Sequence, residues 1–575
     1  MAKFMTVTFD EHNPATDAGR AAGATNDNDD GVEIDYSPLP RLTLRSAVMA
    51  LLISLGGMIF GYDTGSISGF LSMPDYLQRF GEPDGNGGYY FSNVRSGLIV
   101  AILSIGTLCG ALIAAPIADK LGRRPAITIG CLAAIVGFII QITSEQAWYQ
   151  ITIGRLVAGL GIGALSLLVP MYQAETAPSW IRGALVCSYQ LFITMGIFLA
   201  ACFNYATVTN QRDSSASWRI VIGIGFLWAI ALGVGIQFFP ESPRHDYRTG
   251  KKERAIETLC MVHATTRNHW AVYSQVQEIE TKLAAESKIV LPPVAEFLSM
   301  FSAPRMVPRI LIGCALQMFQ ILTGANYFFY YGTVIFRSVN ANMSPFVAQI
   351  ILNTINFVST FLGLYMVEHY GRRKCLIGGS ALMFFCFIVY ASVGHFALNH
   401  EHPSETPGPG AVLVVFSALF ILGFATTWGP MIWAIQAELF PSRYRAKAMA
   451  LSTASNWTWN FCVGFFTPFI TGAIDFSYGY VFAACNLIAG LIVYFFVIEG
   501  QGRTLEEIDT MYLLGVKPWK SEEWVRPPEE KMAKIRREAG VDLAAMAEGS
   551  DNETTVASET REEVKDANVE KHESV

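Results

Sequence analysis

Long apolar runs alternate with short polar segments along most of the chain. A helix that crosses a bilayer needs about 20 mostly apolar residues. Twelve stretches meet this requirement, at residues 46–70, 94–118, 126–144, 148–171, 184–206, 218–239, 309–336, 346–367, 375–397, 411–437, 448–472 and 478–498. The pattern therefore predicts an all-α polytopic membrane protein with twelve transmembrane helices.

Polar segments divide these helices into two groups of six. The segment 240–305 separates the groups, and its run 251–287 has helical periodicity with few Gly or Pro, which predicts short cytosolic helices. The first and last stretches are polar and are predicted to be disordered cytosolic tails. The expected organisation is an N-terminal tail 1–45, a six-helix bundle 46–239, a linker 240–305, a second bundle 306–498 and a C-terminal tail 499–575.

Basic residues gather in every second connection between the spans. The basic connections are DKLGRRP (119–125), SWIRG (179–183), the linker, EHYGRRK (368–374) and SRYRAK (442–447). The connections between them are poor in Lys and Arg. Because loops rich in Lys and Arg stay in the cytosol, these segments are predicted to face it, and an even number of spans places both termini there.

Two short patterns occur once in each half of the chain. YQAETAPSWIRGA (172–184) corresponds to IQAELFPSRYRAK (435–447), and ADKLGRRPA (118–126) corresponds to VEHYGRRKC (367–375). Both pairs fall at equivalent places and in the same order. They predict two homologous six-helix bundles, the architecture of a transporter whose halves rock against each other.

Composition excludes several other classes of protein. The chain is 52% hydrophobic and 15% charged, whereas a soluble protein usually carries about 25% charged residues. Its net charge of −7 is largely in the tails, and nothing indicates a nucleic-acid partner. The ten Cys residues show no paired spacing, so they predict neither a disulfide framework nor a metal site. With no nucleophile beside a base and no metal-ligand cluster, we expect neither an enzyme nor a cofactor.

Several motifs, in this order, resemble those of the sugar porter family of the major facilitator superfamily (MFS) over residues 45–510. They are DKLGRR, GRLVAGLGIG (154–163), FPESPRH (239–245), QILTGANYFFYY (320–331), EHYGRR and EGQGRTLEEID (499–509). NYFFYYGTVIF and GFFTPFI (464–470) look most like fungal hexose transporters. The resemblance implies the MFS fold and transport of a monosaccharide, with glucose the first expectation, across the plasma membrane.

The resemblance also implies a set of sugar contacts. They are Gln190, Gln320, Asn326, Asn353, Trp433 and Asn456. The five amides stand alone in apolar spans, and an amide offers both donors and an acceptor to sugar hydroxyls. The alternative for each is a hydrogen bond between helices. Asn326 follows Gln320 by six residues, nearly two turns, so both are expected to face one cavity. The family's second glutamine is Ile321 here, which removes one sugar hydrogen bond.

The stretch WGPMIW (428–433) places Gly429 and Pro430 inside a span. Proline removes a backbone hydrogen bond and kinks a helix. The functional interpretation is a mobile half-helix that closes over the sugar, with Trp433 as a stacking surface. The alternative is a static kink.

Acidic and basic residues occur together at the cytosolic helix ends of both halves. They are Asp119, Arg123, Arg124, Glu175, Arg182, Glu241, Arg244, Glu368, Arg372, Arg373, Glu438, Arg445, Glu499 and Arg503. We predict salt bridges between the two bundles that hold an outward-facing state and break when the bundles rock. Ordinary positive-inside charge explains the Arg residues but not the acid beside each group.

Asp63 and Arg155 are charged residues inside apolar spans. Each lies seven or so residues from the outer end of its span, which at 1.5 Å per residue places both roughly 10 Å below the outer surface. Equal depth makes them candidate partners. In the family that the chain resembles, such a pair is associated with proton-coupled sugar uptake. A permanent ion pair that orders the first and fourth spans is the alternative.

The leading interpretation is thus a plasma-membrane monosaccharide transporter with sugar, the lipid bilayer and possible coupling protons as its partners. Two alternatives stay open: a facilitator without proton coupling, and a transporter-like sensor that reports glucose through its tail.

Overall fold

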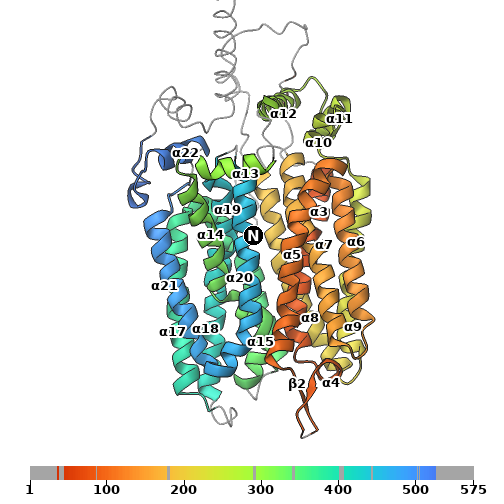
Figure 1. Ribbon diagram of the computed structural model, residues 1–575, viewed down its shortest axis with the longest axis vertical. Helices are drawn as coiled ribbons and strands as arrows, with labels where there is room; N and C mark the ends of the chain where they lie inside the picture. Colours follow the sequence, from red (N-terminus) through yellow and green to blue (C-terminus); the bar gives the residue numbers. More distant parts are fainter. Residues whose placement is uncertain are drawn as a thin grey trace, which may run out of the picture.

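The computed structural model describes residues 35, 37, 44–85, 87–177, 182–288, 293–339, 344–399, 407–441, 444–501, 503 and 505–525. Long helices run side by side and form its main body (Figure 1). Most of the predicted tails, including residues 526–575, lies outside the described residues.

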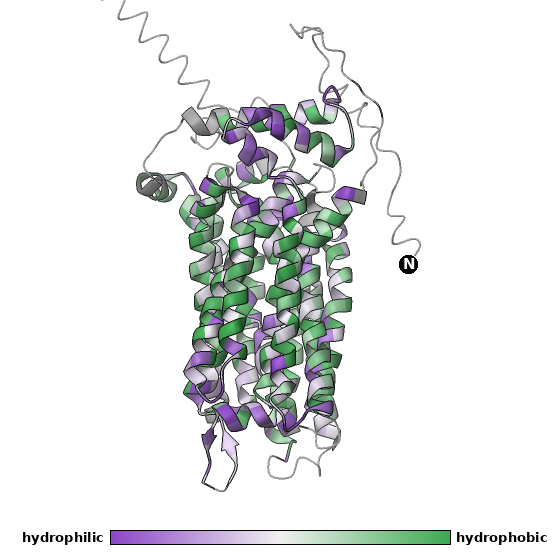
Figure 2. Ribbon diagram, turned by 90° about the vertical axis from the view of Figure 1, so that its right-hand side faces the viewer, coloured by the Kyte–Doolittle hydropathy of each residue, from purple (hydrophilic) through white to green (hydrophobic). Residues whose placement is uncertain are grey.

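Each half of the chain supplies six helical passes. The N-terminal half contains α3 (Leu44–Phe70), α5 (Asn93–Leu121), α6 (Arg123–Ile142), α7 (Trp148–Thr176), α8 (Arg182–Asn210) and α9 (Ala216–Gly235), which ends in the 3-10 turn η1 (Ile236–Phe238). The C-terminal half contains α14 (Met306–Leu322) with α15 (Ala325–Val339), α16 (Pro345–His369), α17 (Arg372–Phe396), α18 (Pro407–Thr426) with α19 (Trp428–Leu439), α20 (Arg445–Ile474) and α21 (Tyr478–Phe496). Apolar residues cover these helices over most of their length (Figure 2).

Eleven stretches of the described chain are long and apolar enough to cross a membrane. The longest, Arg445–Phe496, holds both α20 and α21 joined by the 3-10 turn η3 (Asp475–Ser477), so the described helices make twelve passes. The predicted twelve-helix architecture is therefore confirmed.

The two ends of the bundle differ. The linker end carries α10 (Pro243–Arg248), α11 (Lys252–His263), α12 (Trp270–Lys288), α13 (Pro293–Ser302), α22 (Leu505–Leu513) and the 3-10 turn η4 (Pro518–Lys520) (Figure 1). The hairpin end carries α4 (Pro74–Phe80) and two short antiparallel strands, β1 (Glu82–Pro83) and β2 (Tyr89–Tyr90). Helices α11 and α12 lie in the segment where the sequence predicts helices.

Two passes of the C-terminal half are interrupted. Gly324, at φ 98°, separates α14 from α15, and a Cβ there would press on the rings of Phe387 and Phe482. Thr427 separates α18 from α19. The predicted kink thus lies three residues before Pro430, which sits in the first turn of α19, where a missing backbone N–H costs no helical hydrogen bond. The break at Gly324, which was not predicted, places Gln320 on α14 and Asn326 on α15. That both side chains face one cavity stays a prediction.

Candidate functional site

Three amide side chains meet where the interrupted passes approach α20. Gln320 Nε2 on α14 donates to the carbonyls of Trp428 (3.0 Å) and Gly429 (3.1 Å), at the start of α19. Asn456 Nδ2 on α20 donates to Gln320 Oε1 (2.9 Å) and to Gln317 Oε1 (2.7 Å). All three side chains are buried. The arrangement joins α14, α19 and α20 at one polar point inside an apolar bundle.

Gln317 is a member of this cluster that the sequence analysis missed. It is fully buried, and its Nε2 has no hydrogen-bond partner among the described residues. It lies three residues before Gln320, about one helical turn, so the criterion of an isolated amide in an apolar span would have found it.

The other predicted sugar contacts lie on separate helices. Asn353 on α16 is buried and donates to the carbonyl of Ile197 on α8 (3.4 Å), so it joins the two halves. Gln190 on α8 and Asn326 on α15 are half-buried. Trp433 on α19 is 38% exposed, and its role as a stacking surface stays a prediction.

The structure brings Asp63 and Arg155 together. Arg155 Nη2 lies 3.3 Å from Asp63 Oδ2, and the side chains are only 1% and 7% exposed. Charges buried this deeply are tolerated when they are paired. Asp63 and Arg155, which the sequence places at equal depth, are therefore in contact between α3 and α7.

An aromatic and polar cluster on α4 lies close to this pair. Asp75 accepts hydrogen bonds from Trp218 Nε1 (2.9 Å) and Arg79 Nε (2.8 Å), which ties α4 to α9. Burial raises the pKa of Tyr76, while the charge of Arg155 acts on it in the opposite direction. The charge of Asp63 acts on the pKa of Tyr76 in the same direction as burial, so both members of the ion pair influence this phenol.

At the linker end of the N-terminal half, acids cap and bridge the start of α6. Glu241 accepts hydrogen bonds from the backbone N–H groups of Arg123 (2.8 Å) and Arg124 (3.2 Å). Arg123 Nη2 also donates to Glu175 Oε1 (3.0 Å), and the two side chains form an ion pair in which Nε lies 3.0 Å from Oε2. A carboxylate at a helix N-terminus is stabilised by the unpaired N–H groups there.

The C-terminal half repeats this arrangement at the start of α17. Glu499 accepts from the N–H groups of Arg372 and Arg373, both at 3.0 Å, and Arg372 Nη2 lies 3.0 Å from Glu438 Oε1. Gly122 and Gly371, with φ 101° and 83°, precede the two helices. The repeated sequence motif thus builds the same cap in each half.

The capping pairs Arg123–Glu175 and Arg372–Glu438 each lie within one half. Asp119 adds a pair with Arg248 (2.9 Å), and Arg503 donates to the carbonyls of Ser521 and Trp524. Arg445 donates to the carbonyl of Phe440 (3.2 Å). Arg244 lies at the start of α10, and the side chains of Arg182 and Glu368 lie outside the described residues. An exchange of these partners between the bundles stays a prediction.

The two halves contact each other from the middle of the bundle to the hairpin end. Ser68 Oγ on α3 lies 3.2 Å from Thr333 Oγ1 on α15, and Ser104 Oγ on α5 donates to Asn460 Oδ1 on α20 (3.3 Å). Phe198 on α8 stacks on Phe357 of α16, with ring centroids 5.9 Å apart. These contacts join the two halves from the middle of the bundle towards the hairpin end.

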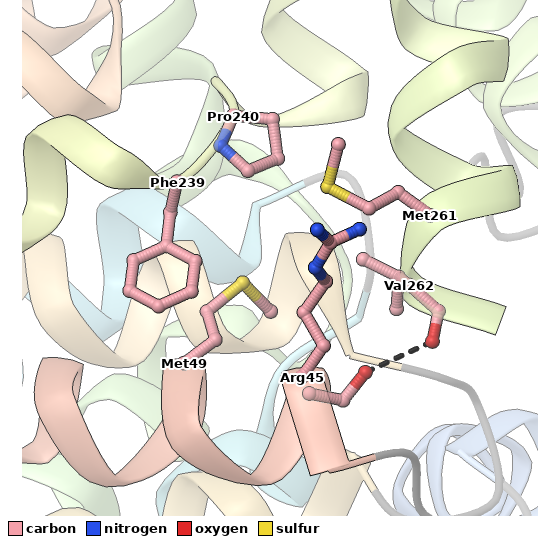
Figure 3. A pocket seen from close by; sticks show the side chains of 7 residues that line it. Arg45, Met49, Phe239, Pro240, Met261 and Val262 are labelled. Carbon is pink, nitrogen blue, oxygen red and sulfur yellow. Dashed lines mark hydrogen bonds between the residues drawn. The ribbon is translucent and has the colours of Figure 1, made fainter. Parts of the chain in front are cut away.

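A small pocket at the linker end does not belong to the amide cluster. It lies where α3 begins and α11 ends, between Arg45, Met49, Phe239 and Met261, and its volume is about 10 Å³ (Figure 3). Ser46 Oγ closes one side by donating to the Val262 carbonyl (2.9 Å). The volume holds about one water molecule, far less than a sugar needs.

Comparison with known proteins places the chain among transporters. The family described as "Sugar (and other) transporter" matches residues 49–512. The chain is 43% identical over 499 residues to the low-affinity glucose transporter HXT4 of Saccharomyces cerevisiae, covering 86% of this chain and 85% of that one. It is 42% identical over 531 residues to the high-affinity hexose transporter HXT6 of the same yeast, covering 92% and 91%. Among solved structures, an inward-open conformation of the xylose transporter XylE from E. coli matches with a TM-score of 0.66 and 25% identity, covering 81% of this chain and 99% of that one.

Proposed function

The chain belongs to the sugar (and other) transporter family, and from this premise we propose that it carries a hexose, most simply glucose, across the plasma membrane by alternating access. The observation that carries the proposal is the identity of 43% to a protein named as a glucose transporter, over 86% of this chain. Members of this family are multi-pass membrane transporters and not enzymes. The linker end, where the basic connections gather, is proposed to face the cytosol.

The buried amides support a sugar site in the middle of the bundle. Gln320 and Asn456 lie at the broken passes, Asn353 lies between the halves, and Trp433 offers a ring on α19. Amides suit hydroxyl groups because each can donate and accept, and an exposed indole ring suits the apolar face of a sugar. Contacts between the halves at the hairpin end support a state that is closed to the outside.

The Asp63–Arg155 pair supports a further proposal, that sugar uptake is coupled to protons. The pair is buried and lies near the hairpin end, the side proposed to face outwards. Protonation of Asp63 would remove the charge that pairs with Arg155, and so would change the contact between α3 and α7. A facilitator that keeps a permanent Asp63–Arg155 pair is the second candidate, because the yeast relatives are named only for glucose or hexose.

Labelled-glucose uptake in a host without its own hexose transporters tests both proposals. We expect uptake that accumulates sugar at external pH 5, is weaker at pH 7 and collapses with a protonophore. Asp63→Asn is expected to keep exchange and lose accumulation. Uptake that only equilibrates, with no effect of the protonophore, would make the protein a facilitator. No uptake from protein shown to reach the surface would refute transport and favour a glucose sensor that acts through its C-terminal tail.

A further inference from the structure

Two backbone carbonyls, those of Trp428 and Gly429, determine which way the side-chain amides of the Gln317–Asn456–Gln320 cluster are oriented. A carbonyl oxygen can only accept, so the group of Gln320 that faces Trp428 and Gly429 must be its NH₂. Its Oε1 then faces Asn456, which must present its own NH₂. The hydrogen-bond pattern therefore fixes which end of each amide is the oxygen and which is the nitrogen.

This direction leaves Gln320 with no free donor. Its NH₂ carries two hydrogens, and the carbonyls of Trp428 (3.0 Å) and Gly429 (3.1 Å) take one each. A sugar hydroxyl oxygen can receive a hydrogen bond from Gln320 only if one of these bonds breaks. Both donors of the residue predicted as a sugar contact are thus bonded to α19 in this structure.

Both carbonyls lie at the start of a helix that is separate from the preceding one. Thr427 interrupts the pass between α18 and α19, and Pro430 supplies no N–H to bridge the interruption. The indole of Trp428 is fixed on α17, with Nε1 donating to Ser380 Oγ at 2.9 Å. Gln320 therefore holds the beginning of α19 to α14, next to the interruption at Thr427.

We propose that Gln320 is a sugar-released latch: its amide holds α19 in the empty carrier, and a sugar hydroxyl that takes its N–H groups frees α19 to move. The proposal rests on the hexose transport proposed above and adds how the site reports that it is filled. The empty carrier must break the latch unaided in order to reorient, whereas the loaded carrier reorients with the latch already open.

The test compares two fluxes of labelled glucose in a host without hexose transporters. Net uptake into sugar-free cells requires the empty carrier to return, and equilibrium exchange does not. In the wild type we expect exchange to be faster than net uptake. Gln320→Met keeps the length of the side chain but has no N–H group. In this variant we expect the ratio of exchange to net uptake to fall about fivefold, or down to one. Loss of about one hydrogen bond, worth about 1 kcal/mol, changes a rate by about this factor.

Gln436 provides the matched control. It lies on α19, is buried, and its Nε2 donates to the carbonyl of Gly313 on α14 (2.9 Å), so it joins the same two helices at another place. Gln436→Met should keep the wild-type ratio. An equal fall in Gln436→Met would mean general loosening of the α14–α19 contact and would overturn the latch.

The remaining outcomes are equally decisive. If Gln320→Met raises KM for both fluxes equally and leaves their ratio unchanged, Gln320 is a simple sugar contact and the latch is refuted. A wild-type ratio of one also refutes it, whereas a wild type without any uptake refutes the proposed function instead.

If Gln320→Met does not reach the surface, Gln320→Glu repeats the test, because its carboxylate accepts but cannot donate. If that variant fails too, hydrogen exchange of purified wild type decides: glucose must increase exchange in Trp428–Leu439, and no increase overturns the proposal.

Discussion

The roles of single buried residues in this protein depend on which of their polar atoms are already bonded. Asp63 and Arg155 illustrate this at its simplest, since each is buried and each neutralises the other. Removing one partner of such a pair leaves an uncompensated buried charge, which typically costs about 3–5 kcal/mol.

We therefore predict that Asp63→Asn lowers stability by about 3 kcal/mol and that Asp63→Asn/Arg155→Gln recovers most of the loss. Thermal unfolding of the purified protein in detergent measures both. Asp119→Asn is the control, because its carboxylate, which pairs with Arg248 and Arg123, is 54% exposed, and pairs of exposed groups contribute little. If the double variant is as unstable as Asp63→Asn, the unpaired charge of Arg155 is not the cause of the lost stability.

For single residues, counting along a span predicts how deep a side chain lies in the membrane, but not which way it points. Counting residues from the ends of two spans was enough to bring Asp63 and Arg155 to one level. Counting did not foresee that Gly324 breaks the helix between Gln320 and Asn326, so their shared cavity stays a prediction. That break depends on close packing against Phe387 and Phe482, residues far away in the chain, so no local pattern announces it.

At the scale of elements, helices approach closely where glycine removes the side chain. A Cβ on Gly61 of α3 would collide with the backbone of Ile193 on α8. Bringing backbones this close is how membrane helices gain packing, because lipid and apolar side chains are alike in polarity.

We predict that Gly61→Ala separates α3 from α8 and lowers stability by about 1–3 kcal/mol, the usual cost of overpacking. Gly223→Ala in α9 is the matched control, because a Cβ there meets no atom within 4 Å. It should be neutral or stabilise by up to about 1 kcal/mol, the helix-propensity gain from Gly to Ala. Detergent unfolding compares the two, and equal effects would contradict the close approach.

Helices α11 and α12 are joined by a buried histidine. His263 Nε2 bonds Gln275 Oε1 (2.8 Å), and burial lowers the pKa of His263, with His269 acting in the same direction and Gln275 against it. The folded pair therefore binds fewer protons than the unfolded one below about pH 6.5, the ordinary value for histidine. The contribution of His263 to stability is complete above that pH and is lost as the pH falls through the lowered pKa.

We accordingly predict that hydrogen exchange in α11 and α12, corrected for the intrinsic effect of pH, rises between pH 7.5 and pH 5.5. His263→Gln should show a smaller rise, because it has no group that titrates in this range. The same rise in both proteins would assign the effect to another group.

At the scale of the whole molecule, the helix-capping charges lie at the linker end, whereas the contacts described between the halves lie from the middle to the hairpin end. The sequence repeat correctly indicated two equivalent halves, yet it could not say which charges pair with which. The acids Glu241 and Glu499 recur because each half must cap its own helix after Gly122 and Gly371, a requirement that appears only once the helices are placed. The halves meet instead through hydroxyls, amides and rings towards the hairpin end.

Alternating access requires the contact at the hairpin end to open in every cycle, so a covalent bond across it should stop transport. Ser68 and Thr333 are buried and their side-chain oxygens lie 3.2 Å apart across the α3–α15 contact. We predict that Ser68→Cys/Thr333→Cys loses glucose uptake by tenfold or more after oxidation and regains it with a thiol reductant. The two single variants, treated with the same oxidant, should keep their uptake, which controls for the ten native cysteines. If mass spectrometry shows the cross-link formed while uptake continues, this end of the interface does not open during transport, and a rocking motion about the central site is refuted.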